Sequence, residues 1–446
     1  MSSAMMRKIN RRRIMQGTAG LMGLAAARSR GVGRASAQAE VSGEIEFAYY
    51  NWGPESIAFF KEMAEAFQAS HPDTEINLSL PPFDQYDQTL SVLLATGNGP
   101  DIITTAAATQ ALFAEGRLLD LTDRVAADPV LLDETKFIQS GWDVYRFGTD
   151  RIYGMYSGAD TLLLYYNKTM FDAAGIPYPT AEWSWGDFVE AATALTIRDG
   201  DRVTQWGCVL GAFDDPEWGW ANLVWMEGAD IFDSRPQFSR LTLNNEPALK
   251  VLNLLHDLVY THEVAPTPSI SEAVADQGGF ESGTVGMMVD GGWSIQPRKA
   301  IEAFEWDIQT LPVGSKGFVG QFWAGAPMQI SASSENQELA WEYVRWFASD
   351  VEAQTIVAKV ATQVPALLEV ANSEAFLGVP GLPGNVEAWT RSLLTALPGD
   401  SFNPRKAELL DKIWRPEWEK FQNDSVTAEE FAAKVETDGN AFLSES

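Results

Sequence analysis

The sequence has little cysteine, little histidine and few basic residues for its length. Its 446 residues include one cysteine, three histidines, and 32 Lys and Arg against 61 Asp and Glu. A lone cysteine cannot form a disulfide within the chain, and no CxxC pair, HExxH motif or GxxxxGK[ST] loop occurs, which argues against redox, zinc-enzyme and nucleotide-dependent functions. The formal charge of −29 opposes binding to nucleic acids or anionic lipids, because such partners need a basic surface that releases counterions.

The first 37 residues differ in composition from the rest of the chain. They carry eight of the basic residues and no acidic one, and Arg11-Arg12-Arg13 precedes a weakly apolar, glycine-containing stretch over residues 16–27. This pattern is typical of a twin-arginine signal peptide, and Ala35-Ser36-Ala37 offers small residues to a signal peptidase. We predict export to the periplasm with cleavage near Ala37. The alternative, a basic helix of the mature protein, is disfavoured by the low helix propensity of glycine.

The predicted mature chain loses eight positive charges and no negative one, so its formal charge falls from −29 to −37. No later apolar run approaches the ~20 residues of a membrane-spanning helix, so we expect no membrane insertion. With 46% hydrophobic residues the chain can bury large cores, and its length favours two lobes.

Strand and helix patterns alternate from residue 44 onward. Residues 44–50 and 76–80 alternate as strands, residues 57–67 and 86–94 have apolar residues at helical spacing, and residues 101–104 are typical of a buried strand. This order predicts an α/β lobe with a largely parallel sheet, whose ligands bind beyond the carboxyl ends of the strands.

The later sequence indicates a second lobe and crossings between the two. Residues 152–166 and 318–331 are strand-like and rich in glycine, as expected of segments that cross between lobes, whereas residues 185–195, 248–260 and 339–347 have helical periodicity.

Several short motifs follow one another in a fixed order: Leu94-Ala95-Thr96-Gly97-Asn98-Gly99-Pro100-Asp101-Ile102, Gly116-Arg117-Leu118-Leu119-Asp120-Leu121, Tyr165-Tyr166-Asn167-Lys168, Gly286-Met287-Met288, Gly292-Trp293 and Leu311-Pro312-Val313-Gly314. No single motif is specific. Together, and behind an export signal, they resemble the extracellular solute-binding proteins of sugar-importing ABC transporters, the maltose-binding-protein-like group.

The resemblance implies a two-lobed α/β fold of the periplasmic-binding-protein type (type II), with discontinuous lobes joined by hinge crossovers. We expect residues 38–157 with 325–365 in the N-terminal lobe and residues 158–324 with 366–446 in the C-terminal lobe. Such a protein is a monomer and not an enzyme. It captures a sugar or sugar derivative by hinge closure and delivers it to the permease subunits of an ABC transporter, without a cofactor or metal.

A sugar site needs aromatic rings for the apolar C–H faces and polar groups for the hydroxyls. Asn51, Trp52, Thr104 and Thr105 lie at predicted strand ends, and local packing or turn bonding is their alternative role. Trp218 and Trp220 belong to an aromatic-rich loop, of which at least one tryptophan should face the ligand and the others the core. Trp323 lies at the second crossover, with packing against the sheet as its alternative.

The resemblance adds further candidates. Asp160 lies at the first crossover, where similar proteins place a polar ligand contact, although a turn cap is the alternative. Gly291, Gly292 and Trp293 match a loop at which the backbone approaches the ligand and an aromatic ring stacks on it. Arg405, beside Pro404 in a late loop, is a candidate from its residue type and not from the resemblance: it would suit an anionic group, or else a surface ion pair.

An exported carbohydrate-active enzyme, either a glycoside hydrolase or a lyase, is the main alternative function. Such enzymes use paired carboxylates, and Asp214 with Asp215, or Asp160 with Asp290, are the pairs that the sequence offers. Sequence alone gives no distance between them.

Overall fold

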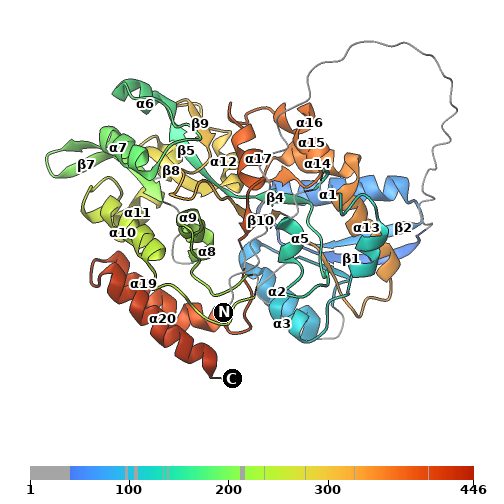
Figure 1. Cartoon of the computed structure of the whole chain (residues 1–446). Coiled ribbons are helices and arrows are strands. Elements are labelled where there is room, and N and C mark those ends of the chain that lie inside the picture. Colours follow the sequence, from blue (N-terminus) through green and yellow to red (C-terminus); the bar gives the residue numbers. More distant parts are fainter. Residues whose placement is uncertain are drawn as a thin grey trace, which may run out of the picture. The chain divides into compact units, whose positions relative to one another are not determined.

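The computed structural model describes residues 41–445 except 96–98, 105–108, 134, 138–139, 211–215, 236, 277, 326 and 400. The predicted signal peptide and Thr105 lie outside the described residues. Contacts group Val41–Ser446 into one unit, which contains three sheets (Figure 1).

The first sheet is the predicted α/β sheet. Its strand order is β11 (Gln329–Ile330), β3 (Ile102–Ile103), β1 (Gly43–Ala48) and β2 (Thr74–Ser79). β1 pairs parallel to both β2 and β3, while the late strand β11 adds antiparallel to β3. The sequence prediction of a largely parallel sheet is confirmed here.

Helices from two distant parts of the chain cover this first sheet. Figure 1 shows α1 (Pro54–Ser70) beside α13 (Gln337–Ser349) and α14 (Val351–Val360). Phe47 of β1 packs at ring-centroid distances of 5.7 Å from Phe60 and 5.8 Å from Tyr343, which joins the three elements in one core. The shorter helices of this part are α2 (Tyr86–Ala95), α3 (Thr109–Ala114), α4 (Thr122–Ala127) and α5 (Ser140–Val144), with a 3₁₀ turn at Phe83–Gln85.

A second sheet has five strands of mixed direction. Its order is β6 (Ile197–Asp199), β7 (Arg202–Leu210), β8 (Val285–Gly291), β5 (Leu162–Asn167) and β9 (Trp306–Gln309). β5 runs antiparallel to both of its neighbours and is buried at every position. The helices around this sheet and its core are α6 (Lys168–Ala174), α7 (Trp185–Leu195), α8 (Pro216–Gly219), α9 (Ala221–Glu227), α10 (Glu246–Tyr260), α11 (Pro268–Asp276), α12 (Ile295–Arg298) and α17 (Glu387–Leu393), with 3₁₀ turns at Gly279–Ser282 and Gly292–Ser294.

A third sheet consists of short strands from the predicted crossings. Its order is β12 (Val364–Pro365), β4 (Gly158–Asp160), β10 (Gln321–Gly325) and β13 (Leu397–Pro398). We call it the crossover sheet. β4 leads directly into β5 of the second sheet, and β10 is followed by β11 of the first, so it links the other two sheets along the chain.

The remaining helices pack on either large core. α15 (Leu368–Ala371) and α16 (Glu374–Leu377) contact α14. Near the carboxyl end, α18 (Lys406–Leu409), a π-helical turn at Leu410–Trp414, α19 (Arg415–Gln422) and α20 (Ala428–Ser444) extend the second core towards α10.

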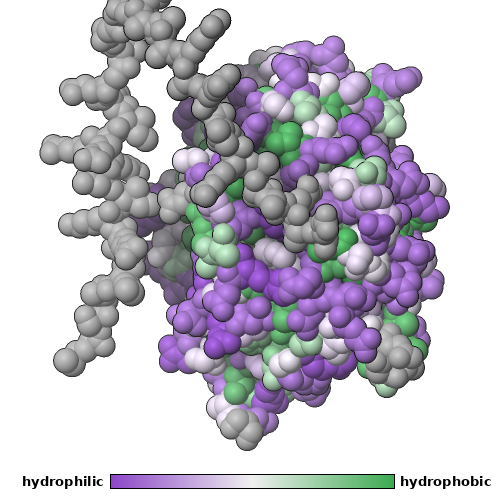
Figure 2. Space-filling view, turned by 90° about the vertical axis from the view of Figure 1, so that its right-hand side faces the viewer, coloured by the Kyte–Doolittle hydropathy of each residue, from purple (hydrophilic) through white to green (hydrophobic). Residues whose placement is uncertain are grey.

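The surface reflects the acidic composition. The face in Figure 2 is dominated by hydrophilic side chains, with small, scattered hydrophobic patches. In the part of the chain that the structure describes, no helix is both long and apolar enough to span a bilayer.

Candidate functional site

Two solvent-exposed tryptophans mark the candidate site, one beyond a strand of each large sheet. Trp52 follows β1 and is 41% exposed, whereas Trp293 follows β8 and is 37% exposed. Three residues after each tryptophan the two segments meet, because Gln296 Nε2 donates a hydrogen bond to Glu55 Oε2 at 3.4 Å. The structure therefore brings into contact the two segments that carry these candidates, which lie far apart in the sequence.

Trp52 belongs to a wider aromatic edge of the first sheet. Its ring lies 6.2 Å from that of Tyr50, which in turn contacts Phe83 edge-on at 4.9 Å and Tyr86 at 5.8 Å. Phe83 is 67% exposed. Sequence reasoning missed Tyr50 and Phe83, although Pro81-Pro82 before Phe83 ends the β2 strand pattern at the same edge of the sheet.

Asn51 and Thr104 hold the strands at this edge together by hydrogen bonds that involve backbone groups. The Asn51 side chain donates to the Leu80 carbonyl at 2.6 Å, which ties the end of β1 to the segment after β2. Thr104 is fully buried, and its N–H donates to the carbonyl of Ala48 and to the Tyr86 hydroxyl, both at 3.2 Å. These contacts favour the local-bonding alternative for both residues.

The Asp160 carboxylate is enclosed by protein donors. Oδ1 accepts hydrogen bonds from the N–H of Thr161 at 2.7 Å, from the N–H of Gly292 at 3.0 Å and from the Trp389 indole at 2.9 Å. Oδ2 accepts one from the N–H of Trp293 at 2.9 Å. The residue is 5% exposed. This geometry favours the structural alternative, a carboxylate that caps a turn, over direct contact with a sugar.

Burial opposes the ionisation of Asp160. It raises the pKa of this carboxyl well above its usual range, although the hydrogen bonds from Thr161, Trp389, Trp293 and Gly292 oppose the shift. The group is therefore harder to ionise than an exposed aspartate.

Gly291 and Gly292 are required by close packing. A Cβ atom at Gly291 would lie 2.2 Å from the Trp293 ring, and one at Gly292 would lie 2.2 Å from the Trp389 ring and 2.4 Å from Asp160 Oδ1. The two glycines thus allow the Trp293 indole and the Asp160 carboxylate to approach the same turn.

Trp323 supports Trp293 from the inside. It lies opposite Asp160 in the antiparallel pairing of β10 with β4, and its ring centroid is 5.5 Å from that of Trp293. At 3% exposed, Trp323 is a packing partner of the exposed indole, which is the alternative role expected for it.

Of the two candidate tryptophans in the aromatic-rich segment, the structure describes the side chain of one. Trp220 is fully buried and its ring stacks with those of Trp414 and Trp418 at 6.0 and 5.8 Å, so in this structure it offers no face to a ligand. Trp218 lies in α8, and its side chain is outside the described residues.

Arg405 binds residues at the carboxyl end of the chain. Its guanidinium lies 3.6 Å from the ring centroid of Phe442 and donates to the Glu445 carbonyl at 2.6 Å and to the Phe442 carbonyl. Cations stabilise the last carbonyls of a helix, here those of α20. These contacts favour a structural role for Arg405 over the anionic-ligand contact and the surface ion pair.

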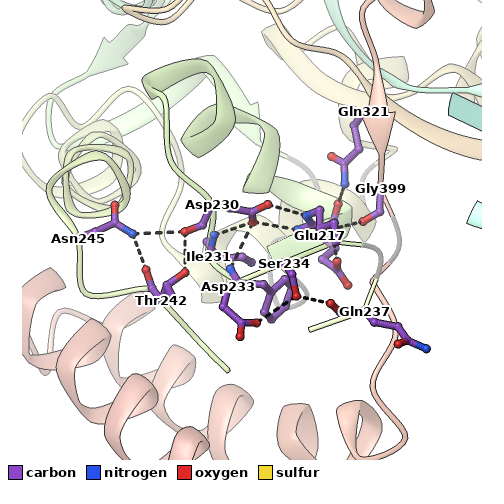
Figure 3. A network of polar contacts seen from close by, with 12 residues as sticks. Glu217, Asp230, Ile231, Asp233, Ser234, Gln237, Thr242, Asn245, Gln321 and Gly399 are labelled. Atoms are coloured by element: carbon purple, nitrogen blue, oxygen red, sulfur yellow. Dashed lines mark hydrogen bonds and ion pairs between the residues drawn. The ribbon is translucent and has the colours of Figure 1, made fainter. Parts of the chain in front are cut away.

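A buried charge network lies beneath the aromatic-rich segment (Figure 3). Glu217 is fully buried, and its carboxylate pairs with Arg235 Nη1 at 2.6 Å and with Lys406. Arg235 also pairs with Asp230 at 2.8 Å. Sequence reasoning missed this network, because Lys406 lies 189 residues from Glu217 and no local pattern links them.

The network reaches the crossover sheet. Gln321 of β10 donates from its side chain to the Glu217 carbonyl, and Arg235 donates to the Gly399 carbonyl at 3.1 Å. Figure 3 shows Glu217, Gln321 and Gly399 converging on one region. Because α8 carries Trp218, the network anchors the aromatic-rich segment to β10.

A second buried arginine lies behind the Trp293 loop. Arg298 is 2% exposed, pairs with Glu281 at 2.9 Å and Asp290 at 2.8 Å, and lies 4.0 Å from the ring centroid of Tyr165. Its charge is thus balanced by two carboxylates.

The described residues contain no cluster of three His, Cys, Asp or Glu side chains suited to a metal ion. Of the carboxylate pairs considered for an enzyme, Asp160 and Asp290 are both engaged with protein donors. Asp214 and Asp215 lie outside the described residues.

Comparison with known proteins gives relatives along most of the chain. An arabinooligosaccharide-binding protein of Halalkalibacterium halodurans is 28% identical over 231 residues, which are 51% of this chain and 48% of that protein, so the match spans about half the length of this relative. A maltotriose-binding protein of Pyrococcus abyssi is 23% identical over 340 residues, 75% of this chain and 69% of the relative.

The fold is shared with a solved structure. An ABC substrate-binding protein from Listeria monocytogenes in complex with cycloalternan matches with a TM-score of 0.75 and 25% identity, over 90% of this chain and 99% of that one. The predicted α/β fold of the type II periplasmic-binding-protein class is confirmed. Residues 52–354, which include both exposed tryptophans and the crossover strands β4 and β10, match the model of one family, and the chain therefore belongs to the bacterial extracellular solute-binding proteins.

Proposed function

We propose that this protein is the carbohydrate-binding receptor of an ABC importer and that it binds an uncharged oligosaccharide between Trp52 and Trp293. The observation that carries this proposal is the pair of exposed indoles on segments that meet at Glu55 and Gln296. Aromatic rings stack on the apolar C–H faces of sugar rings, so two separate indoles suit a ligand that has more than one ring.

The engaged arginines favour an uncharged ligand. Arg298 is balanced by two carboxylates, and Arg405 is bound to the end of α20. The relatives support the same class, since they include an arabinooligosaccharide-binding and a maltotriose-binding protein. Asn51 and Thr104 then shape the aromatic edge, while Phe83 joins Trp52 as a candidate contact.

Closure of two lobes around the crossover sheet is the proposed mechanism. The N-terminal lobe comprises residues 38–157 and 325–365 and the C-terminal lobe residues 158–324 and 366–446, as predicted from the sequence, with one adjustment. Because α15 and α16 pack on α14, we place residues 366–377 with the N-terminal lobe. A ligand that contacts both lobes shifts the equilibrium towards the closed state. The size of the shift is set by how much more tightly the ligand binds the closed state than the open state.

The cellular context follows from the export signal. We propose that the chain is cleaved near Ala37, acts as a periplasmic monomer, and delivers its sugar to the permease subunits of the importer. Intact mass and amino-terminal sequencing of the secreted protein test the cleavage, and a start at residue 38 is the expected result.

A binding screen tests the function directly. Maltotriose, an arabinotriose, a galactooligosaccharide and, as an anionic comparison, a uronic acid are added to the mature protein in a thermal-shift assay followed by calorimetry. We expect one neutral oligosaccharide to raise the melting temperature and to bind saturably with Kd near micromolar, about −8 kcal/mol.

Chromatography of the same mixtures distinguishes a receptor from an enzyme. The oligosaccharide should be recovered intact after prolonged incubation. Shortened sugars would instead establish the carbohydrate-active enzyme, and an absence of binding across the neutral panel would refute the proposed ligand class.

A further inference from the structure

We infer that Asp160 is a positioning residue: its carboxylate fixes the Gly291–Trp293 turn and thereby orients the exposed Trp293 indole, without touching the sugar itself. The inference rests on the proposed function, because Trp293 is part of a sugar site only if that function is correct. The geometry on which it depends is present without any ligand.

Two consecutive backbone N–H groups of the turn converge on this one side chain. Gly292 N donates to Oδ1 at 3.0 Å and shares its hydrogen with the Thr161 carbonyl at 3.1 Å, whereas Trp293 N donates to Oδ2 at 2.9 Å. These N–H groups open the 3₁₀ turn Gly292–Ser294 and have no partner within a helix. Asp160, 132 residues away in the chain, therefore acts as a carboxylate cap supplied by another strand.

The same pair of strands supports the indole ring. Trp323 lies opposite Asp160 in the pairing of β10 with β4, and its ring is 5.5 Å from Trp293. The Trp293 ring also lies over Gly291, where no Cβ could fit. Backbone and ring are thus both held from the crossover sheet, so any movement of β4 is passed to the surface that Trp293 presents.

An asparagine at position 160 separates this role from packing. Asn has the same shape but only one acceptor oxygen, whereas Asp160 uses both oxygens. If the remaining oxygen keeps the three donors of Oδ1, the new NH₂ group faces the N–H of Trp293, and two donors cannot bond to each other. Asp160→Asn should therefore release Trp293 while leaving the volume of the site unchanged.

A ligand-free experiment tests the inference first. The mature protein is labelled with 5-fluorotryptophan, and the ¹⁹F signal of residue 293 is identified from its loss in Trp293→Phe. In Asp160→Asn we expect this signal to move and to sharpen, as for a ring that has gained mobility. An unchanged Trp293 signal would overturn the inference, whatever happens to sugar binding.

A matched control comes from the first sheet. Asp101 also holds backbone and side-chain donors, Glu46 N at 2.9 Å and Ser334 Oγ at 2.5 Å, but it does not touch the Trp293 turn. Asp101→Asn should leave the Trp293 signal in place. If both variants move it equally, the effect is general loosening and the inference is wrong. Circular dichroism confirms that each variant is folded, and Gly292→Ala provides a second way to disturb the same contact.

A double-mutant cycle tests the link to binding, with maltotriose or the sugar of the screen that binds most tightly. Asp160→Asn should raise Kd about tenfold in the native background, as for loss of one buried hydrogen bond, and less than about twofold in Trp293→Phe. Equal losses in both backgrounds would show direct sugar contact by Asp160 and overturn the inference. If no sugar binds, the proposed function fails, whereas the ¹⁹F result still decides the role of Asp160.

Discussion

At the residue scale, the proposed binding site depends on which aromatic rings reach solvent. The chain has 16 tryptophans, and among those whose side chains the structure describes, only Trp52 and Trp293 are exposed. Buried indoles such as Trp220, Trp323 and Trp389 contribute to packing instead. Exposure at a strand end therefore separates ligand candidates from core residues, a distinction that residue type alone does not make.

Removal of the exposed Trp293 ring should weaken binding without unfolding the protein. For Trp293→Ala we expect Kd for the bound oligosaccharide to rise at least about tenfold, with the melting temperature of the sugar-free protein lowered by about 2 °C or less. Calorimetry and a thermal scan measure the two effects.

Trp220→Ala is the contrasting variant. Because Trp220 is fully buried against Trp414 and Trp418, it should lose about 3–5 kcal/mol of unfolding free energy. A large loss of stability in Trp293→Ala as well would assign Trp293 to packing.

The buried Glu217 makes stability sensitive to acid. Burial by itself raises its pKa, but the charges of Lys406 and Arg235 outweigh burial and hold the pKa of this carboxyl below its usual value. An acid with a lowered folded-state pKa contributes stability above its unfolded pKa, about 4.3, and loses this contribution as pH falls through the folded-state pKa.

Glu217→Gln should therefore cost about 3–5 kcal/mol at neutral pH, because it leaves two largely buried cations with one partner fewer. The cost should shrink on acidification, which denaturant titrations at pH 7 and below pH 4 would measure. Glu338→Gln is the matched control, since its pair with Arg124 lies at the surface and is worth less than about 1 kcal/mol. Equal costs for the two variants would contradict the network's role.

At the element scale, local signals set most helix and strand positions. α1 ends where His71-Pro72 predicted, and α7 begins at Trp185 behind the capping box of Ser184 and Asp187. The five alternating elements between residues 43 and 104 are confirmed, because period and turn residues are local properties of the chain. Pairing partners are not local, and the addition of β11 to β3 joins strands more than 220 residues apart.

A variant of Arg405 can distinguish a role in holding α20 in place from a role in binding the ligand. Arg405→Ala removes the stacking on Phe442 and the hydrogen bonds to the last carbonyls of α20. We expect the unfolding free energy to fall by about 1–2 kcal/mol and the affinity for the oligosaccharide to stay within twofold.

Hydrogen exchange of residues 428–444 would report the loosened helix, and Lys412→Ala, whose ammonium lies farther from the same ring at 5.8 Å, is the control. A loss of sugar affinity with α20 unchanged would restore the ligand role that the sequence suggested for Arg405.

At the scale of the whole molecule, the proposal requires a change of shape on binding. The crossover sheet links the first and second sheets along the chain, and Glu55 and Gln296 are the partners of a hydrogen bond between the tryptophan-bearing segments. Hinge proteins of this kind close around their ligand. We therefore expect small-angle scattering to give a smaller radius of gyration with the oligosaccharide than without it.

The dependence of Kd on salt provides an independent test of whether the negative charge of the protein affects binding of the ligand. Because the proposed ligand is uncharged, its Kd should change less than twofold between 50 and 500 mM salt, in spite of the strongly acidic surface. An affinity that rises steeply with salt, as expected for an anion repelled by the acidic protein, would contradict the neutral ligand. Identical scattering profiles with a sugar that binds would contradict closure.

The sequence by itself predicted the export signal and determined the acidic character, the alternating elements and the family resemblance. Each of these depends on composition or on residues close together in the chain. It also pointed to Trp52 and Trp293. Only the tertiary structure decided which candidates face solvent: it buried Trp220, assigned Asp160 to a turn 132 residues away and joined Glu217 to Lys406. Burial and long-range partners arise from packing between distant segments, and no local pattern of residues encodes them.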